Sequence, residues 1–283
     1  MIDSSDSFQR LTTNGLRWTV HESFLDSFPT LLTVSQKKLC PPPGSHLLKH
    51  KQDRCSFIVE QAWNGRRAIF MKIHEPRGAT AVIKNLLRPS KALTEWRNTL
   101  ALRTLNLPTA TPLAVGTPRR WSPLRSSILV MEAIWPLISL GTYMSERARD
   151  AKTRPLMNTL AHQVAQMHNA GFYHRDLHGG NIVCKIPDNG PVQIYLVDLH
   201  EGFWLGRIPR RWAVRDLARL NSTLVMSVAK RVRFLKHYLH TRRLSSRSTQ
   251  RRWATEIENY TRALWRRSRN RHGIDNQKYG APL

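Results

Sequence analysis

Acidic residues are scarce in this chain of 283 residues. Asp and Glu together number 19, against 45 Lys and Arg, so the formal net charge at pH 7 is +26. This excess predicts a polyanionic partner, which charge alone leaves open between nucleic acid, an anionic membrane surface and an acidic glycolipid. The hydrophobic fraction of 41% is enough to fill one large or two small cores.

Cysteine is scarce as well. The three cysteines, Cys40, Cys55 and Cys184, are far apart in the sequence and odd in number. They form neither a disulfide framework nor a zinc-binding pattern. The chain therefore fits a reducing compartment better than an oxidising one.

The chain has no long apolar run. Its most apolar stretch, residues 128–144, is interrupted by Glu132 and Pro136, which makes it too short and too broken to span a bilayer. The first ten residues contain Asp3 and Asp6 and do not predict a signal peptide. We expect a soluble or peripheral protein on the cytoplasmic side of a membrane.

The most informative motif is His-Arg-Asp-Leu-His-Gly-Gly-Asn at residues 174–181, with Leu-Val-Asp at 196–198 following across a predicted hairpin. Asp176 can accept the proton of an attacking hydroxyl, while Asn181 and Asp198 can hold Mg²⁺ on the phosphates of ATP. The motif requires the expected residues both in the loop and at the end of the following strand, so a chance match is improbable. The alternative is a polar loop with an unrelated surface Asp.

Two strands are predicted upstream, over residues 56–60 and 68–73, joined by a tight turn at Asn64-Gly65. The second strand carries Lys72 within an apolar run. Lys72 can reach the phosphate oxygens of a nucleotide, or it can be a strand-end lysine in solvent.

Helical spacing of apolar residues predicts a helix over residues 93–105. Its Glu95 can form the ion pair with Lys72 that positions a nucleotide in kinases, or it can be an exposed carboxylate. A buried strand is predicted over residues 128–132. Glu132, which ends that strand, joins Lys72 and Glu95 among the candidate cofactor-binding residues.

The second half is predicted to be mainly helical. A helix over residues 155–170 leads into the motif, and Gly171 ends it. Two apolar stripes, over 224–239 and 253–264, are interpreted as helix faces in a core. We predict an α+β fold with an N-terminal extension (1–44), a sheet-containing N-lobe (45–133) and a C-lobe with basic terminal helices (134–283).

Together these features resemble a protein-kinase-like fold, and longer stretches narrow the resemblance to the bacterial lipopolysaccharide core kinases. The stretches are Ile83–Leu87 with Glu95-Trp96, Val197–His200, Ile208–Trp212 and Arg215–Leu217. The tripeptide Asp-Leu-His at 198–200 stands where protein kinases have Asp-Phe-Gly. In this it resembles the branch of the family that phosphorylates heptose.

The resemblance implies the role of each matched residue. It implies Asp176 as catalytic base and Asn181 and Asp198 as metal ligands. It implies Lys72 as phosphate anchor with Glu95 as its partner. Asp216 is implied as an acid that ties its helix to the catalytic loop, or it is a helix cap or surface acid.

Two features depart from protein kinases. The stretch His50–Arg54 has no glycine where a phosphate-binding loop is expected, so basic side chains take that place. The segment between Asp198 and Asp216 is short, which disfavours a peptide acceptor. It carries Arg207, Arg210, Arg211 and Arg215, and arginine forks suit the phosphate and carboxylate groups of an inner-core glycolipid, although a solvated basic loop is the alternative.

The leading hypothesis is an ATP- and Mg²⁺-dependent kinase of a sugar hydroxyl, most simply heptose, in the lipopolysaccharide inner core. Its partners are the anionic core glycolipid and the anionic inner-membrane surface, and no nucleic-acid-binding module is recognisable. Alternatives are a phosphotransferase for Kdo, another small molecule or a protein hydroxyl, and a non-catalytic pseudokinase that binds polyanions.

Overall fold

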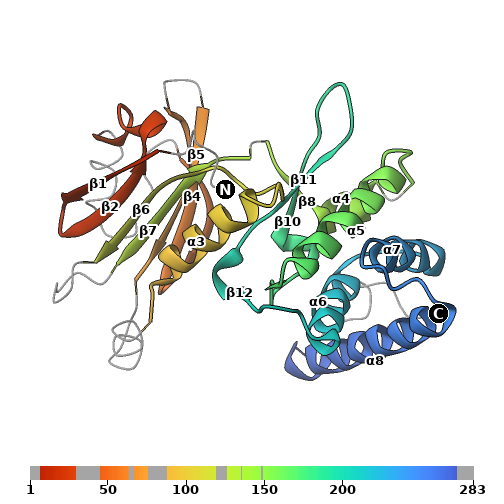
Figure 1. Cartoon of the computed structure of the whole chain (residues 1–283). Coiled ribbons are helices and arrows are strands. Elements are labelled where there is room, and N and C mark those ends of the chain that lie inside the picture. Colours follow the sequence, from red (N-terminus) through yellow and green to blue (C-terminus); the bar gives the residue numbers. More distant parts are fainter. Residues whose placement is uncertain are drawn as a thin grey trace. The chain divides into compact units, whose positions relative to one another are not determined.

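The computed structural model describes residues 7–29, 45–63, 67–75, 88–118, 126–134, 136–147 and 149–272. The chain divides into two compact units, residues 1–135 and 136–283. Unit 1 is dominated by a sheet and unit 2 by helices (Figure 1). The Asn64-Gly65 turn, Cys40 and the family-like stretch 83–87 lie outside the described residues.

Unit 1 is an antiparallel sheet of seven described strands with the order β1-β2-β6-β7-β5-β4-β3. Helix α3 (Lys91–Arg103) packs on one face of it (Figure 1). The strands are β1 (Phe8–Thr13), β2 (Leu16–His21), β3 (His46–Lys51), β4 (Arg54–Trp63), β5 (Arg67–His74), β6 (Pro112–Pro118) and β7 (Ser127–Glu132). A short 3-10 turn, η1 (Glu22–Phe24), follows β2.

Strand β7 shows how the sheet separates two cores. Side chains alternate between the faces of a strand. Ile128 and Val130 therefore join one core cluster, while Leu129 and Met131 join another beneath Trp96 of α3. Any residue that lies opposite Leu129 consequently faces α3.

The N-terminal residues correct one sequence expectation. Residues 1–44 were expected to precede the fold, but β1 and β2 belong to the sheet, and β2 pairs with β6. The physical reason is the alternation of buried Leu16, Trp18 and Val20 with polar neighbours, which makes β2 a half-buried strand. Trp18 lies opposite Gly116, where an added Cβ would approach its indole within 2.9 Å.

Unit 2 contains the longer helices. They are α4 (Leu140–Glu146), α5 (Thr153–Asn169), α6 (Arg210–Thr223), α7 (Val228–Thr241) and α8 (Arg247–His272). Short strands and turns connect them: β8 (Ile138–Ser139), β9 (Phe172–Tyr173), η2 (Gly179–Asn181), β10 (Ile182–Lys185), β11 (Gln193–Leu196), η3 (Leu199–Glu201) and β12 (Phe203–Trp204).

Helix α5 delivers the chain into the 174–181 motif, as predicted. Its apolar stripe, from Leu156 to Met167, is buried. Gly171 follows the helix with a φ of +90°, which glycine adopts without strain. A Cβ at this position would also collide with the carbonyl oxygen of Leu205, whose own N–H donates to Gly171 at 2.7 Å.

The apolar stripe predicted over 224–239 is only partly core. Leu224 is buried, but Val228 and Val232 are 60% and 46% exposed. The stripe spans a break in the chain, because α6 ends at Thr223 and Ser227 caps the start of α7. In α8 the corresponding prediction is confirmed for Trp253 and Ile257, which are buried.

Two further expectations concern membranes and cysteines. None of the helices in the described ranges is long and apolar enough to cross a membrane. Cys55 and Cys184, the cysteines within those ranges, are both buried.

Candidate active site

In unit 1 the sheet register places Lys72 beneath α3. Lys72 lies opposite Leu129 and so faces the helix that carries Glu95. The Nζ of Lys72 donates to Oε2 of Glu95 at 2.8 Å. The two side chains are only 5% and 2% exposed, which excludes both solvent-facing alternatives considered from the sequence.

The position of Glu95 follows from the start of α3. Ser90 caps this helix, and its hydroxyl accepts a hydrogen bond from the Leu93 backbone at 3.2 Å. Glu95 then falls on the buried side with Ala92 and Trp96. A buried ion pair loses hydration on both sides, so each charge depends on the other for its stability.

Glu132 is engaged within unit 1. Its backbone N–H donates to the Thr111 carbonyl at 2.8 Å. Its carboxylate lies 3.5 Å from the guanidinium of Arg67, in a pair whose side chains are 34% and 60% exposed respectively. The structure thus gives Glu132 a surface ion pair, and its role in cofactor binding stays a prediction.

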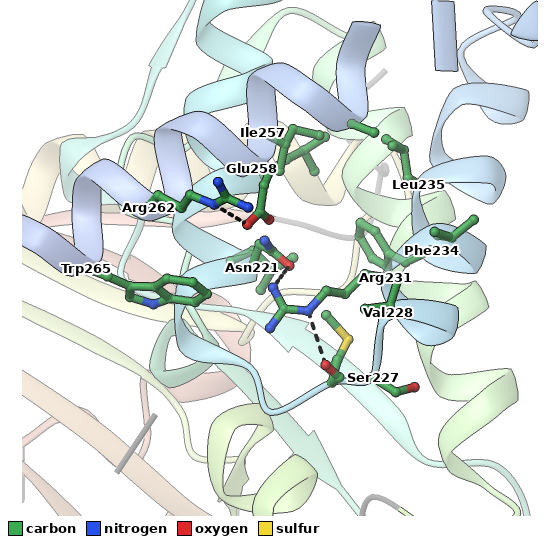
Figure 2. Close-up of a pocket in the computed structure, with 15 residues that line it drawn as sticks. Asn221, Ser227, Val228, Arg231, Phe234, Leu235, Ile257, Glu258, Arg262 and Trp265 are labelled. Carbon is green, nitrogen blue, oxygen red and sulfur yellow. Dashed lines mark hydrogen bonds and ion pairs between the residues drawn. The ribbon is translucent and has the colours of Figure 1, made fainter. Parts of the chain in front are cut away.

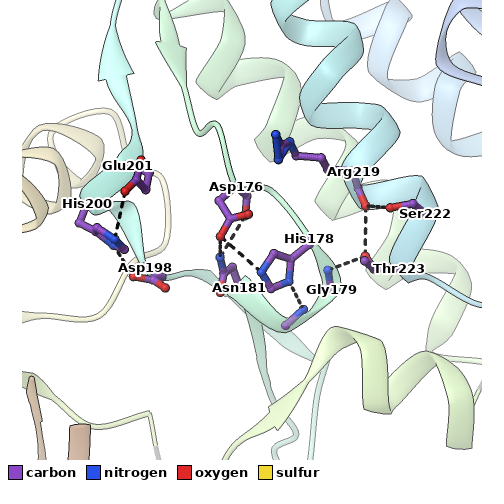
Figure 3. Close-up of polar contacts among 11 residues, drawn as sticks. Asp176, His178, Gly179, Asn181, Asp198, His200, Glu201, Arg219, Ser222 and Thr223 are labelled. Atoms are coloured by element: carbon purple, nitrogen blue, oxygen red, sulfur yellow. Dashed lines mark hydrogen bonds and ion pairs between the residues drawn. The ribbon is translucent and has the colours of Figure 1, made fainter. Parts of the chain in front are cut away.

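In unit 2 the predicted base and one predicted metal ligand are in direct contact (Figure 3). The Nδ2 of Asn181 donates to the carbonyl oxygen of Asp176 at 3.0 Å and to its Oδ2 at 3.2 Å. The preceding residue, Arg175, adopts a φ of +69° and pairs with Glu201 at 3.1 Å. These contacts hold the loop around Asp176, whose side chain is 44% exposed.

His178 controls the electrostatics of Asp176. Its Nε2 lies 3.6 Å from Oδ2 of Asp176, and its Nδ1 accepts a hydrogen bond from the Gly180 backbone at 3.0 Å. Hydrogen bonding to His178 lowers the pKa of Asp176, although partial burial opposes this effect. Asp176 is therefore ionised at neutral pH and can accept a proton. His178 therefore orients the loop through its contacts with Asp176 and the Gly180 backbone.

The second predicted metal ligand reaches the same end of the β10–β11 hairpin. Ile182 pairs with Leu196, and the Val197 N–H donates to the Asn181 carbonyl at 3.1 Å. Asp198 follows at once in a left-handed conformation with a φ of +60°. One of its oxygens, Oδ1, lies 2.6 Å from Nδ1 of His200 (Figure 3).

Beneath the loop, Asp216 of α6 is fully buried and ties its helix to the motif. Its Oδ2 accepts the backbone N–H of His174 at 2.9 Å. This agrees with the tying role implied for Asp216 and excludes the surface alternative. The His174 ring takes no part in this contact, because neither of its nitrogens has a hydrogen-bond partner within the described part of the chain. Its ring packs instead against Phe172.

A buried chain of hydrogen bonds continues from Asp216 to α7. The Nε2 of His168 lies 3.3 Å from Oδ2 of Asp216, and its Nδ1 lies 2.7 Å from the Tyr238 hydroxyl. Arg242 donates to that hydroxyl at 2.8 Å, so the hydroxyl donates to Nδ1 and His168 donates through Nε2. Burial lowers the pKa of His168, consistent with a neutral ring.

Sequence reasoning missed this chain. His168 and Tyr238 are 70 residues apart, and each falls in a helical pattern typical of core residues. Only the helix packing joins them. The extra signal in the sequence was a histidine and a tyrosine on mainly apolar helix faces, which does not distinguish a buried network from packing.

A family model described as "Lipopolysaccharide kinase (Kdo/WaaP) family" matches residues 50–266, which is most of the chain. The chain belongs to the lipopolysaccharide kinase (Kdo/WaaP) family. It is accordingly an ATP-dependent kinase that phosphorylates a sugar hydroxyl in lipopolysaccharide core biosynthesis.

Curated relatives within the Kdo/WaaP family are bacterial core kinases. The chain is 30% identical over 187 residues to the lipopolysaccharide core heptose(I) kinase WaaP of Escherichia coli, a match that covers 61% of this chain and 70% of that protein. It is also 30% identical over 195 residues to the corresponding WaaP of Pseudomonas aeruginosa, with coverages of 61% and 69%.

A solved structure supports the fold of this family member. The structure of WaaP in complex with acyl carrier protein matches with a TM-score of 0.62 and 22% identity, covering 88% of this chain and 99% of that one. The predicted two-lobed, kinase-like α+β fold is confirmed.

The candidate metal ligands fit Mg²⁺ by their chemistry. Asn181 and Asp198 offer the hard oxygen donors that Mg²⁺ prefers. Because Nδ2 of Asn181 is directed to Asp176, the Oδ1 atom is the part of the amide that remains to meet a cation. Asp198 is 25% exposed, so its carboxylate is accessible to a hydrated ion.

Proposed function

We propose that the protein transfers the γ-phosphoryl group of ATP to a hydroxyl of heptose in the lipopolysaccharide inner core. The observation that carries the proposal is the half-exposed, ionised Asp176, held by Asn181 and His178, in a chain whose relatives are named heptose(I) kinases. Kdo is the second acceptor to test, since the family model covers it by name.

The bond changes follow from the site. Asp176 orients the sugar hydroxyl and takes up its proton as the hydroxyl oxygen bonds to the γ-phosphorus. The bond between that phosphorus and the bridging oxygen breaks, and ADP leaves. Positioning and electrostatic stabilisation supply most of the catalysis in such a transfer.

The remaining residues bind the nucleotide. We assign Lys72, oriented by Glu95, to the nucleotide phosphates, and Glu132 to the nucleotide side of unit 1. Asn181 and Asp198 would hold Mg²⁺. When bound there, the ion neutralises negative charge on the phosphoryl group in transfer. Unit 1 in this assignment is the nucleotide-binding lobe, and unit 2 carries the base and the acceptor residues.

The test uses the full chain with labelled ATP and truncated core glycolipids that either contain or lack heptose. We expect transfer only to the heptose-containing acceptor, with the new phosphate located on a heptose hydroxyl by mass spectrometry. Transfer to the acceptor that carries Kdo but no heptose would identify Kdo, rather than heptose, as the sugar that is phosphorylated. Transfer to neither would overturn the proposal.

A membrane-proximal location is part of this proposal. The acceptor is a glycolipid, and α7 exposes Arg233 and Lys236 on its outer surface. Each such residue close to an anionic surface contributes about 1 kcal/mol of binding. Co-sedimentation with anionic vesicles should therefore weaken as salt increases, while neutral vesicles should leave the protein in the supernatant.

We further propose an acyl carrier protein as a partner, as in the WaaP complex. An apolar cavity of about 400 Å³ lies among α6, α7 and α8 (Figure 2). Arg231 crosses it, donating to Asn221 at 2.8 Å and lying over Trp265. A cavity of this size and lining suits an apolar chain.

A cavity-filling variant tests that partner. Ala254 lines the cavity, whereas Ala229 is exposed on α7 and does not. Ala254→Trp should weaken binding of an acylated carrier protein in calorimetry, and Ala229→Trp should not. Equal affinities for both variants would remove the cavity from the proposal.

A further inference from the structure

A second cavity in unit 2 is lined by arginines from three separate segments. It measures about 380 Å³ and lies between the start of α6 and the connection from α7 to α8. Arg207, Arg210, Arg242 and Arg252 line it, together with Thr249 and Trp253. We propose that this cavity binds a phosphate group, as a recognition subsite for a phosphorylated ligand.

The charge balance of the cavity favours an anion. No Asp or Glu is among the described residues that line it. The nearby Glu256 pairs with two of the arginines, at 3.2 Å from Arg210 and 3.3 Å from Arg252. One carboxylate thus pairs with two of the four guanidinium groups, and the mutual repulsion among the four falls when an anion enters.

Arg242 makes the cavity a built site rather than a group of mobile surface arginines. Its Nε donates to Oδ1 of Asn169 at 3.2 Å, and its Nη1 donates to the Tyr238 hydroxyl at 2.8 Å. Its guanidinium also lies 5.8 Å from the ring of Trp253. A guanidinium fixed in this way loses little freedom when its remaining donors bind a ligand.

The backbone around the cavity contributes positive charge, as the arginine side chains do. Pro209 is the N-cap residue of α6 and Arg210 its first residue, and Thr249 lies in the first turn of α8. Both helices exceed 13 residues, and their N-termini carry partial positive charge. Phosphate accepts several hydrogen bonds in the forked geometry that arginine offers, which a neutral sugar does not match.

Phosphate in this cavity has two possible sources. The first is a phosphate carried by the glycolipid acceptor, and this reading rests on the proposed function. The second is free inorganic phosphate. Both use the same chemistry, so the experiment has to separate them.

The test compares two double variants that each remove two positive charges. Arg207→Gln with Arg252→Gln changes exposed residues of the cavity, and Arg251→Gln with Arg266→Gln changes exposed residues of α8 outside it. Calorimetry with inorganic phosphate should show at least about tenfold weaker binding for the cavity variant only, since each charge-assisted hydrogen bond is worth a factor of ten or more. Circular dichroism verifies that both variants fold.

Kinetics with the glycolipid then identify the source. If the cavity variant raises KM for a phosphorylated acceptor but not for its dephosphorylated form, with kcat and the KM for ATP unchanged, the acceptor supplies the phosphate. If calorimetric binding is lost and every KM is unchanged, the site serves free phosphate. Binding and KM values equal to those of the unmutated protein would overturn the inference. The calorimetry stands even if no heptose acceptor is phosphorylated, so the two proposals fail separately.

Discussion

The two units hold their chemically important charges in opposite ways. In unit 1, Lys72 and Glu95 are enclosed by sheet and helix, with exposures of 5% and 2%. In unit 2, Asp176 and Asp198 are 44% and 25% exposed. Removing one partner of the enclosed pair should therefore destabilise unit 1. Substituting the open carboxylates should change the stability of unit 2 little.

The difference reflects what each group has to do. An anchoring lysine needs a fixed position, which the buried carboxylate provides. A base must meet a substrate hydroxyl and exchange protons, so it requires access. Unit 2 has an enclosed acid of its own, Asp216, which accepts the backbone N–H of His174 and so shapes the loop.

The largest expected effect is on catalysis, at the open carboxylate. Asp176→Asn keeps the shape of the side chain but removes the proton acceptor, so kcat should fall by about 10²–10⁴-fold. The free energy of unfolding should change by less than about 1 kcal/mol, because the position is half exposed. Steady-state kinetics and urea unfolding measure the two quantities. Asp188→Asn, on an exposed loop, is the matched control. A large loss of stability in Asp176→Asn would mean that this open carboxylate stabilises the fold, as the enclosed pair does.

The next effect is on stability, at the enclosed pair. Lys72→Met leaves Glu95 buried without its cation and should cost about 3–5 kcal/mol in urea unfolding. The double change Lys72→Met with Glu95→Leu should recover most of that stability without restoring activity. Arg67→Met breaks an exposed pair in the same sheet and should cost less than about 1 kcal/mol. Equal losses of stability for the buried and the exposed pair would mean that burial does not determine how much an ion pair matters to this sheet.

The smallest effect concerns pH and the enclosed part of unit 2. Burial lowers the native pKa of His168, whereas the unfolded chain has a value of about 6.5. Below that pH the unfolded state binds a proton that the native state does not, so stability falls as pH decreases towards the native pKa. The slope is about 1.4 kcal/mol per pH unit for each such histidine.

A variant separates this contribution from the rest. His174 is buried with a lowered pKa as well, so wild-type stability should decline below about pH 6.5 through both residues. His168→Gln should reduce the slope by the contribution of one histidine. Urea unfolding at a series of pH values measures it, and an unchanged slope would mean that His168 is not held neutral.

Much of the fold could be predicted from short-range patterns. Period-two and helical spacing located the strands around Lys72 and the helix that leads to Gly171, because local burial determines those patterns. The strands β1 and β2 were missed because residues 1–44 were assigned as a whole to an N-terminal extension. Val228 and Val232 were misjudged because their spacing continues a stripe across two separate helices.

The site divides in the same way. Asp176, Asn181 and Asp198 lie within one short stretch, so their proximity follows from a loop and a hairpin. The convergence of Arg242 with Arg207, or of His168 with Tyr238, depends on how distant helices pack. No spacing rule in a single sequence encodes that.

The bond from the His174 amide to the buried Asp216 carboxylate bears on dynamics. An amide hydrogen exchanges with solvent only when its hydrogen bond opens. This one opens only by exposing a carboxylate that is also bonded to His168. The amide of His174 should therefore exchange as slowly as those of the helix core, although it lies two residues from the proposed base, Asp176. We expect hydrogen exchange to place the start of the 174–181 motif in the most persistent part of unit 2.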